Sequence, residues 1–158
     1  MEVNNYSTLG VLGYPLKQSL SPFLHNYWLK HYKLEYNYCK FELKDISEIN
    51  LSIKRLKIKG LNVTIPYKKN IISYLDKVDK TARFLKAVNT VKNNNGILEG
   101  YNTDVKGFVN GLKKFRNLNT KRPAVVIGAG GASQAIVYSL VKEGFKKIFL
   151  MNRTRKKA

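Results

Sequence analysis

The chain has 158 residues, enough for one domain of ordinary size or for a small domain and part of a second. Its 44% content of hydrophobic residues excludes a disordered chain, because disorder requires low hydrophobicity. The formal charge of +19 comes from 29 Lys and Arg against 10 Asp and Glu. The lysines are scattered along the chain, which favours solvated faces over a nucleic-acid partner, although a smaller part of the charge can serve anionic ligands.

The start of the chain has no recognisable targeting pattern. Residues 1–5 lack the basic and apolar regions of a signal peptide, and no apolar run approaches the ~18 residues needed to cross a bilayer. The single cysteine, Cys39, excludes an intrachain disulfide and is expected as a small core residue. We therefore expect a cytoplasmic protein with no membrane partner.

Residues 1–104 alternate between short strand patterns and helix patterns. Short apolar runs predict strands at 8–12, 36–43 and 61–65. Apolar residues at helical spacing predict helices that begin at Ser21 and that cover 46–56 and 71–75. An Asn/Gly cluster between two β-prone runs predicts a hairpin formed by 88–91 and 97–100.

Two of these helices begin with capping residues. Ser21 supplies a hydroxyl group next to Pro22, which suits the first helical position, and either Asp45 or Ser47 caps the following helix. The helix that begins at Ser21 has an apolar face made by Phe23, Leu24, Tyr27, Trp28 and Leu34.

The last third of the chain has a different pattern. A helix is expected over 103–115. After a polar connection come an apolar run at 124–127, a glycine turn, a helix over 132–143 stopped by Gly144, and a second apolar run at 148–151. This order predicts a βαβ unit whose strands are buried on both faces of a parallel sheet.

The glycine turn predicts a dinucleotide site. Gly128, Gly130, Gly131 and Ala132 follow a strand and open a helix. Glycine is needed there because the turn is tight and the backbone must approach a pyrophosphate closely, while the helix N-terminus presents N–H groups to the phosphates. A purely structural turn is the alternative.

The end of the second apolar run distinguishes between cofactors. An NAD site usually has an acidic residue about 20 residues after the glycine turn. Here the run is followed by Asn152, Arg153 and Thr154. A guanidinium group grips a 2′-phosphate with two parallel hydrogen bonds, and Lys157 would add a second charge. NADP is therefore favoured over NAD, and the alternative is that 153–157 is only a basic tail.

Polar residues also occupy the turns of the first part of the chain. Asn62 and Thr64 lie on the same side of a strand, near its carboxyl end, where α/β proteins bind ligands. Other polar residues recur at neighbouring turns: Ser19, Ser21, Lys68, Asn89, Thr90, Asn102, Thr103 and Asp104. Taken singly, each is better explained as a turn or a cap. No metal site is predicted.

In their order along the chain, six segments resemble the shikimate dehydrogenase family. They are Ser19-Leu20-Ser21-Pro22, Asn-Val-Thr-Ile-Pro-Tyr-Lys at 62–68, Ala-Val-Asn-Thr at 87–90, Gly-Tyr-Asn-Thr-Asp at 100–104, Gly-Ala-Gly-Gly-Ala at 128–132, and Asn-Arg-Thr at 152–154. The resemblance runs over essentially the whole chain, and six ordered motifs are far more specific than any one of them.

The resemblance implies an activity and a set of residues. The activity is the NADPH-dependent, reversible reduction of 3-dehydroshikimate to shikimate, in chorismate and aromatic amino-acid biosynthesis. Lys68 and Asp104 match the family's catalytic pair. The substrate-binding positions match Ser19, Ser21, Thr64, Lys68, Asn89 and Asp104, with Asn62 and Asn102 as supporting candidates. The cofactor positions match Gly128, Gly130, Gly131, Ala132, Asn152, Arg153, Thr154 and Lys157.

The expected fold class is α/β. A substrate domain with a mostly parallel sheet covers 1–104, a connecting helix and linker cover 105–122, and the start of a doubly wound Rossmann domain covers 123–158. The family also has further Rossmann strands and a returning C-terminal helix, so we expect the natural protein to continue beyond Ala158 and the 158-residue chain to be inactive alone.

Three other interpretations remain open from the sequence. One is a quinate/shikimate dehydrogenase of broader specificity, another is a non-catalytic fragment, and the most distant is a basic nucleic-acid-binding protein. The family that the chain resembles includes both monomers and dimers, so a homodimer is a further possibility.

Overall fold

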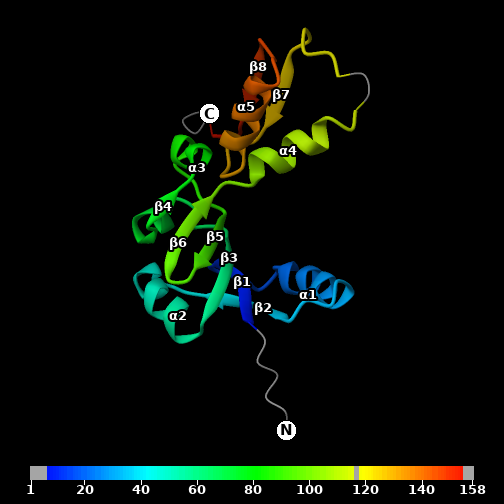
Figure 1. Ribbon diagram of the computed structural model, residues 1–158. Coiled ribbons are helices and arrows are strands. Elements are labelled where there is room, and N and C mark those ends of the chain that lie inside the picture. Colours follow the sequence, from blue (N-terminus) through cyan, green and yellow to red (C-terminus); the bar gives the residue numbers. More distant parts are fainter. Residues whose placement is uncertain (1–6, 116–117, 155–158) are drawn as a thin grey trace. The chain divides into compact units, whose positions relative to one another are not determined.

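The computed structural model describes residues 7–115 and 118–154 (Figure 1). The chain forms two compact units, Met1–Asn102 and Thr103–Ala158. The first unit is built on a six-stranded sheet and the second on a two-stranded sheet. Both combine strands with helices, which confirms the α/β class predicted from the sequence.

The sheet of the first unit is parallel on one side and antiparallel on the other. Its strands are β1 (Ser7–Gly13), β2 (Tyr36–Glu42), β3 (Ile58–Val63), β4 (Lys77–Val78), β5 (Thr90–Asn94) and β6 (Ile97–Tyr101), in the order β2-β1-β3-β5-β6-β4. β1 is parallel to β2 and β3, whereas β5 is antiparallel to β3 and to β6. The carboxyl ends of β1 and β3, the start of β5 and the end of β6 therefore share one edge, called here the carboxyl edge.

Helical segments cover this sheet and close the core. They are α1 (Ser21–His31), the 3₁₀ turns η1 (Ile46–Glu48) and η2 (Asn70–Tyr74), α2 (Ile49–Arg55) and α3 (Lys80–Leu85). The largest fully buried side chains of this unit come from strands, from helical segments and from the loop before β5, and they are Leu12, Ile49, Ile58, Ile71 and Val88. β4 and α3 were not predicted, because the segment from 76 to 86 has little apolar periodicity.

The start and the apolar face of α1 differ from the prediction. The helix cap is Leu20, which makes no side-chain capping bond, and Ser21 is the first helical residue. The capping oxygen comes instead from Ser19, whose Oγ accepts a 3.4 Å hydrogen bond from the Ser21 amide. The apolar face is exposed in the described residues, with Phe23 78% and Tyr27 62% accessible, because α1 packs on the sheet through Leu29.

Two other local predictions change, and a third is confirmed. Cys39 is exposed rather than in the core, because Tyr38 takes the inward position of β2 and its neighbour faces the other way. The helix expected over 46–56 is divided into η1 and α2, with the Asp45 carboxylate accepting a 2.9 Å bond from the Ser47 amide, so Asp45 is the cap. The predicted hairpin is confirmed.

The second unit contains the predicted βαβ unit. β7 (Ala124–Ile127) and β8 (Ile148–Met151) are parallel neighbours joined by α5 (Ser133–Lys142), which ends before Gly144 at a φ of +91°. The helix expected over 103–115 is α4 (Asp104–Leu112) and ends before Phe115. The apolar runs suit strands buried on both faces of a complete sheet, but this unit leaves one face of β7 uncovered, and Ile127 is 86% exposed.

Candidate functional site

Three asparagines lie at the carboxyl edge of the first sheet. Asn62 is near the end of β3 and pairs with Thr90 of β5. Asn89 precedes Thr90, and Asn102 follows Tyr101, the last residue of β6. Because Thr90 is also the ladder partner of Tyr101, the hairpin register brings all three asparagines to the same place. Strand alternation had indicated only that Asn62 and Thr64 share one side of β3, and the hairpin register adds Asn89 and Asn102 to this edge.

The amides of Asn89 and Asn102 are held by nearby groups. Each side chain is only 9% exposed. The Oδ1 atom of Asn89 accepts a 3.0 Å bond from the Thr90 hydroxyl, and Nδ2 of Asn102 donates a 2.9 Å bond to the Ala87 carbonyl. A buried amide held in this way has a defined orientation.

The amide of Asn62 is oriented by a tyrosine that sequence reasoning did not single out. The hydroxyl of Tyr38 donates a 2.6 Å hydrogen bond to Asn62 Oδ1. The backbone of Tyr38 is in turn held by two 2.9 Å bonds with the side chain of Asn26, and its ring stacks on His25 at 4.2 Å. Burial raises the pKa of Tyr38 far above its usual value, so the hydroxyl remains a donor. The alternation of β2 around Tyr38 was the only signal for it.

The loop after β1 carries the two predicted serines. Ser19 and Ser21 are both half-buried, and the hydrogen bond between them fixes the turn that opens α1. Thr64 is attached to this edge by a 2.9 Å bond from its amide to the Leu12 carbonyl. A side chain at Gly13 would place its Cβ 2.5 Å from the Thr64 methyl group, so glycine is required for the close approach of β1 and β3.

Lys68 follows β3 on a segment that is bound to the rest of the edge. Its side chain is half-buried, and its carbonyl accepts a 2.7 Å bond from the Val88 amide. Its neighbour Tyr67 is buried and donates a 2.5 Å bond to the Leu43 carbonyl, which anchors the segment in the core. Asp104, the other member of the predicted catalytic pair, is the first residue of α4 in the second unit, so the pairing stays a prediction.

The glycine turn of the second unit leaves space that protein packing does not fill. Gly128 has a φ of +101°, which only glycine adopts readily. A Cβ added at Gly130 or Gly131 would meet no atom within 4 Å. The helix that follows is capped by Ala132 without a side-chain bond, so its N-terminal amides suit an anion. This arrangement fits the close approach of a pyrophosphate.

The end of β8 is tied to the glycine turn. Asn152 accepts a 3.2 Å bond from the Ala129 amide on Oδ1 and donates a 2.7 Å bond to the Thr154 carbonyl. Arg153, between Asn152 and Thr154 in sequence, is exposed and carries the guanidinium group that would meet a 2′-phosphate. The predicted cofactor residues from 128 to 154 therefore meet within this unit and fit NADP, whereas Lys157 lies outside the described residues.

The described residues contain neither a metal cluster nor a membrane-spanning helix. Over 7–115 and 118–154, no group of three or more His, Cys, Asp or Glu residues is arranged to hold a metal ion. None of the helices in the same ranges is long and apolar enough to cross a membrane.

Comparison with known proteins assigns both units. Residues 11–91 match the model of the shikimate dehydrogenase substrate binding domain, and residues 110–158 match that of shikimate / quinate 5-dehydrogenase. The NADP(+) shikimate dehydrogenase of Caldanaerobacter subterraneus subsp. tengcongensis is 46% identical over 153 residues, which cover 94% of this chain and 54% of that protein. The chain spans about half the length of the curated relatives it matches.

Two solved structures share the fold. The shikimate 5-dehydrogenase of Thermus thermophilus in complex with NADP(H) and shikimate has a TM-score of 0.82 at 35% identity, covering 96% of this chain and 58% of that chain. The quinate dehydrogenase of Corynebacterium glutamicum in complex with NAD has a TM-score of 0.88 at 30% identity, covering 97% and 57%. With a family model matching more than half of its residues and these relatives along nearly all of its length, the chain belongs to the shikimate dehydrogenase family.

Proposed function

We propose that the chain provides the substrate-binding and cofactor-phosphate parts of a cytoplasmic, NADP-dependent shikimate dehydrogenase. The observation that carries this proposal is the convergence of Asn62, Asn89 and Asn102 at the carboxyl edge, which Thr64 joins at the end of β3. Residues 1–104 serve the substrate, 105–122 connect, and 123–158 begin the nucleotide domain. The reaction is the reversible reduction of 3-dehydroshikimate to shikimate in chorismate biosynthesis.

The carboxyl edge suits a ring that carries several hydroxyl groups. Serine, threonine and asparagine side chains each donate and accept hydrogen bonds, so together they recognise hydroxyl groups in either role. Ser19 and Ser21 approach from the loop after β1, while Thr64 and Asn89 approach from β3 and β5. The Tyr38 hydroxyl keeps the Oδ1 atom of Asn62 occupied and thereby turns its Nδ2 donors toward the ligand.

Lys68 and Asp104 carry the chemistry in this proposal. NADPH, when bound, supplies the hydride. The carbonyl oxygen of the ring then gains negative charge, which the Lys68 ammonium stabilises and neutralises by giving up a proton. The Asp104 carboxylate is the other member of the pair and orients the hydroxyl groups of the ring by accepting their hydrogen bonds. In the reverse direction Lys68 takes the proton from the hydroxyl group.

NADP is held by the second unit. The amides of Gly130, Gly131 and Ala132 receive the pyrophosphate, and Asn152, Arg153 and Thr154 receive the 2′-phosphate, with Lys157 as a further cation. The absence of an acidic residue at 152–154 and the fit of an Arg fork to a phosphate support NADP over NAD.

Binding measurements on the chain test the proposal with a matched pair of lysines. Lys68→Met should reduce the affinity for shikimate by about tenfold or more, because a charge-assisted hydrogen bond is lost. Lys69→Met, at the exposed neighbour, should leave the affinity within about twofold. Equal affinities for the two variants, measured by calorimetry, would overturn the assignment of the substrate site.

Quinate is the second candidate substrate. The quinate dehydrogenase structure matches this chain as closely in fold as the shikimate dehydrogenases do. Calorimetry with shikimate and quinate on the same preparation distinguishes the two, and a tighter complex with quinate would reassign the substrate.

A further inference from the structure

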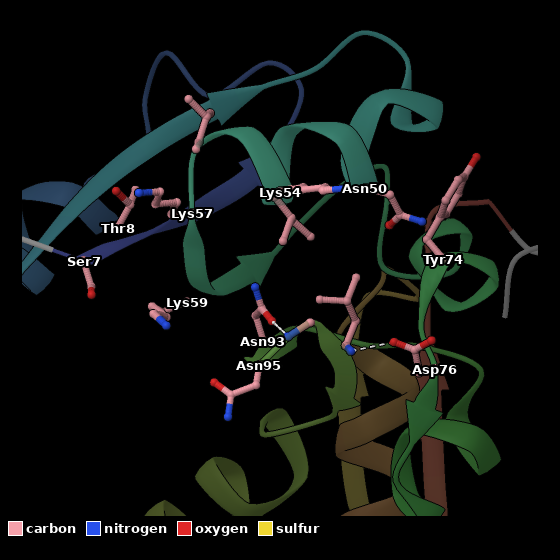
Figure 2. A pocket seen from close by; sticks show the side chains of 14 residues that line it. Ser7, Thr8, Asn50, Lys54, Lys57, Lys59, Tyr74, Asp76, Asn93 and Asn95 are labelled. Carbon is pink, nitrogen blue, oxygen red and sulfur yellow. Dashed lines mark hydrogen bonds between the residues drawn. The ribbon is translucent and has the colours of Figure 1, made fainter.

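A cavity lies at the opposite edge of the first sheet, away from the candidate substrate site. It has a volume of about 820 Å³ and is shown in Figure 2. Its walls are the start of β1, the last turn of α2, the start of β3 and the turn between β5 and β6. Because β1 and β3 are parallel, their amino ends meet here, and we call this space the amino-edge cavity.

The amino-edge cavity has an excess of positive charge. Lys54, Lys57 and Lys59 line it together with a single carboxylate, Asp76. That carboxylate is already engaged, because its Oδ2 atom accepts a 2.7 Å bond from the Leu98 amide (dashed in Figure 2). The three ammonium groups outnumber this one carboxylate, so the lining keeps a net positive charge, and an anion that enters relieves their mutual repulsion.

Neutral groups in the same cavity complete a site for an organic anion. Asn50 and Asn95 add exposed amide groups as donors. Asn93 is held rigid, with Nδ2 donating 2.8 Å to the Ile58 carbonyl and Oδ1 accepting 2.8 Å from the Gly96 amide. Buried Ile53 and Leu98 contribute apolar surface on which a carbon skeleton can rest.

We propose that the amino-edge cavity binds a small phosphate-bearing molecule. Three ammonium groups can meet the several oxygens of a phosphate as point charges. A phosphate carries nearly two negative charges at neutral pH, so three lysines offset its charge better than they match the single charge of one carboxylate. The site is separate from that of the proposed reaction, since Lys59 and Asn62 lie toward opposite ends of β3. It does not depend on which substrate the carboxyl edge takes.

Inorganic pyrophosphate is the probe for this site. Its binding is monitored by two-dimensional NMR of the amide groups of the chain. Pyrophosphate should shift the side-chain amides of Asn50, Asn93 and Asn95 in a saturable way, and the effect should weaken as salt is added. The glycine turn can also take pyrophosphate, but its backbone amides report separately. Shifts confined to residues 128–133, or none at the three asparagines, would overturn the proposal.

Two sets of substitutions with the same change in charge distinguish binding in the amino-edge cavity from diffuse electrostatic attraction to the whole chain. Lys54→Gln, Lys57→Gln and Lys59→Gln together should weaken pyrophosphate binding at the asparagines about tenfold, corresponding to the loss of the localised cations. Lys44→Gln, Lys80→Gln and Lys121→Gln, at exposed positions outside the lining, should change it less than about twofold. Equal losses for the two sets would show diffuse attraction only.

Two further measurements complete the test. Lys54→Gln with Lys59→Gln, which keeps Lys57 at its left-handed φ of +49°, should also weaken binding, and unchanged binding would contradict the proposal. Citrate at matched ionic strength should shift the asparagines less than pyrophosphate does. An equal or larger effect of citrate would overturn the assignment to phosphate.

Discussion

At the level of single residues, Tyr38 connects the packed sheet to the candidate substrate site. Its ring is buried against His25, and its hydroxyl orients the Asn62 amide. Tyr38→Phe keeps the ring and removes only the hydroxyl group. We expect a loss of about 1 kcal/mol in the free energy of unfolding, because Asn62 loses its partner, and a weaker complex with shikimate.

Tyr101→Phe provides the control for this substitution. The Tyr101 hydroxyl also donates a side-chain bond, of 2.9 Å, but its acceptor is the Glu99 carboxylate at the surface. In urea titrations, the free energy of unfolding of this variant should be close to that of the parent chain. If Tyr101→Phe lowers stability and shikimate affinity as much as Tyr38→Phe does, the positioning role of Tyr38 is wrong.

His25 makes stability depend on pH. Burial lowers the pKa of His25 in the folded chain, so the unfolded chain binds more protons. The free energy of unfolding should therefore fall as pH drops below about 6.5, the ordinary value for histidine, and continue to fall until the folded pKa is passed. His25→Gln should flatten this part of the profile in urea titrations between pH 7 and pH 5, and an unchanged slope would contradict the assignment to His25.

At the level of elements, three helices end on a lysine in the left-handed conformation. Lys33, Lys57 and Lys86 follow α1, α2 and α3 with φ of 53°, 49° and 50°. Glycine is usual at this position because a side chain there is strained. Lys86→Gly should raise the free energy of unfolding by about 0.5–1 kcal/mol. Lys80→Gly, at the other end of α3, should lower it, and a gain in both would disprove strain as the cause.

Gly10 in the first unit and Gly131 in the second should respond differently to substitution by alanine. A Cβ at Gly10 would lie 2.3 Å from the Phe41 ring and 2.5 Å from the Cys39 carbonyl, where backbone leaves no room. Gly10→Ala should cost about 1–3 kcal/mol in thermal or urea unfolding. Gly131→Ala, with open space around it, should leave stability nearly unchanged, and the reverse ranking would contradict these packing arguments.

The elements that could be predicted are those with strong local signals. The Asn93–Gly96 cluster specified the hairpin, and the run 124–127 with its glycine turn specified the βαβ unit. Burial was less predictable, because it depends on elements far away in sequence. The prediction for Cys39 was wrong because the pairing of β2 with β1 determines which residues of β2 face inward. The bond between Tyr38 and Asn62 was not predicted, because it joins residues that are 24 apart in sequence.

At the level of the whole molecule, the proposed ligands belong to different units. A ligand at 100 times its dissociation constant adds ~2.7 kcal/mol to the stability of the state that binds it. Hydrogen exchange should show shikimate protecting amides of β3 and β5, and NADP protecting the start of α5. Gly131→Ala should remove the second effect, because its Cβ occupies the space for the pyrophosphate, and leave the first.

The affinities of the same chain for NADP and NAD test whether Arg153 selects the cofactor. Arg153→Gln should weaken NADP binding by about tenfold while changing NAD binding little, since only NADP has the 2′-phosphate. Arg122→Gln, at an exposed residue before β7, is the charge-matched control. Equal weakening of NADP and NAD would show that Arg153 acts on a group common to both.

The tight turn at Asn95 and Gly96 has a consequence far from its own position. It sets which residues of β5 and β6 stand opposite one another, and so it determines, from the remote end of the hairpin, how Asn89 and Asn102 meet Asn62. Inserting one residue there would slide one strand past its neighbour and reverse the faces of its side chains. The length of this loop therefore sets the relative positions of the candidate site residues, although the loop itself lies at the opposite edge of the sheet.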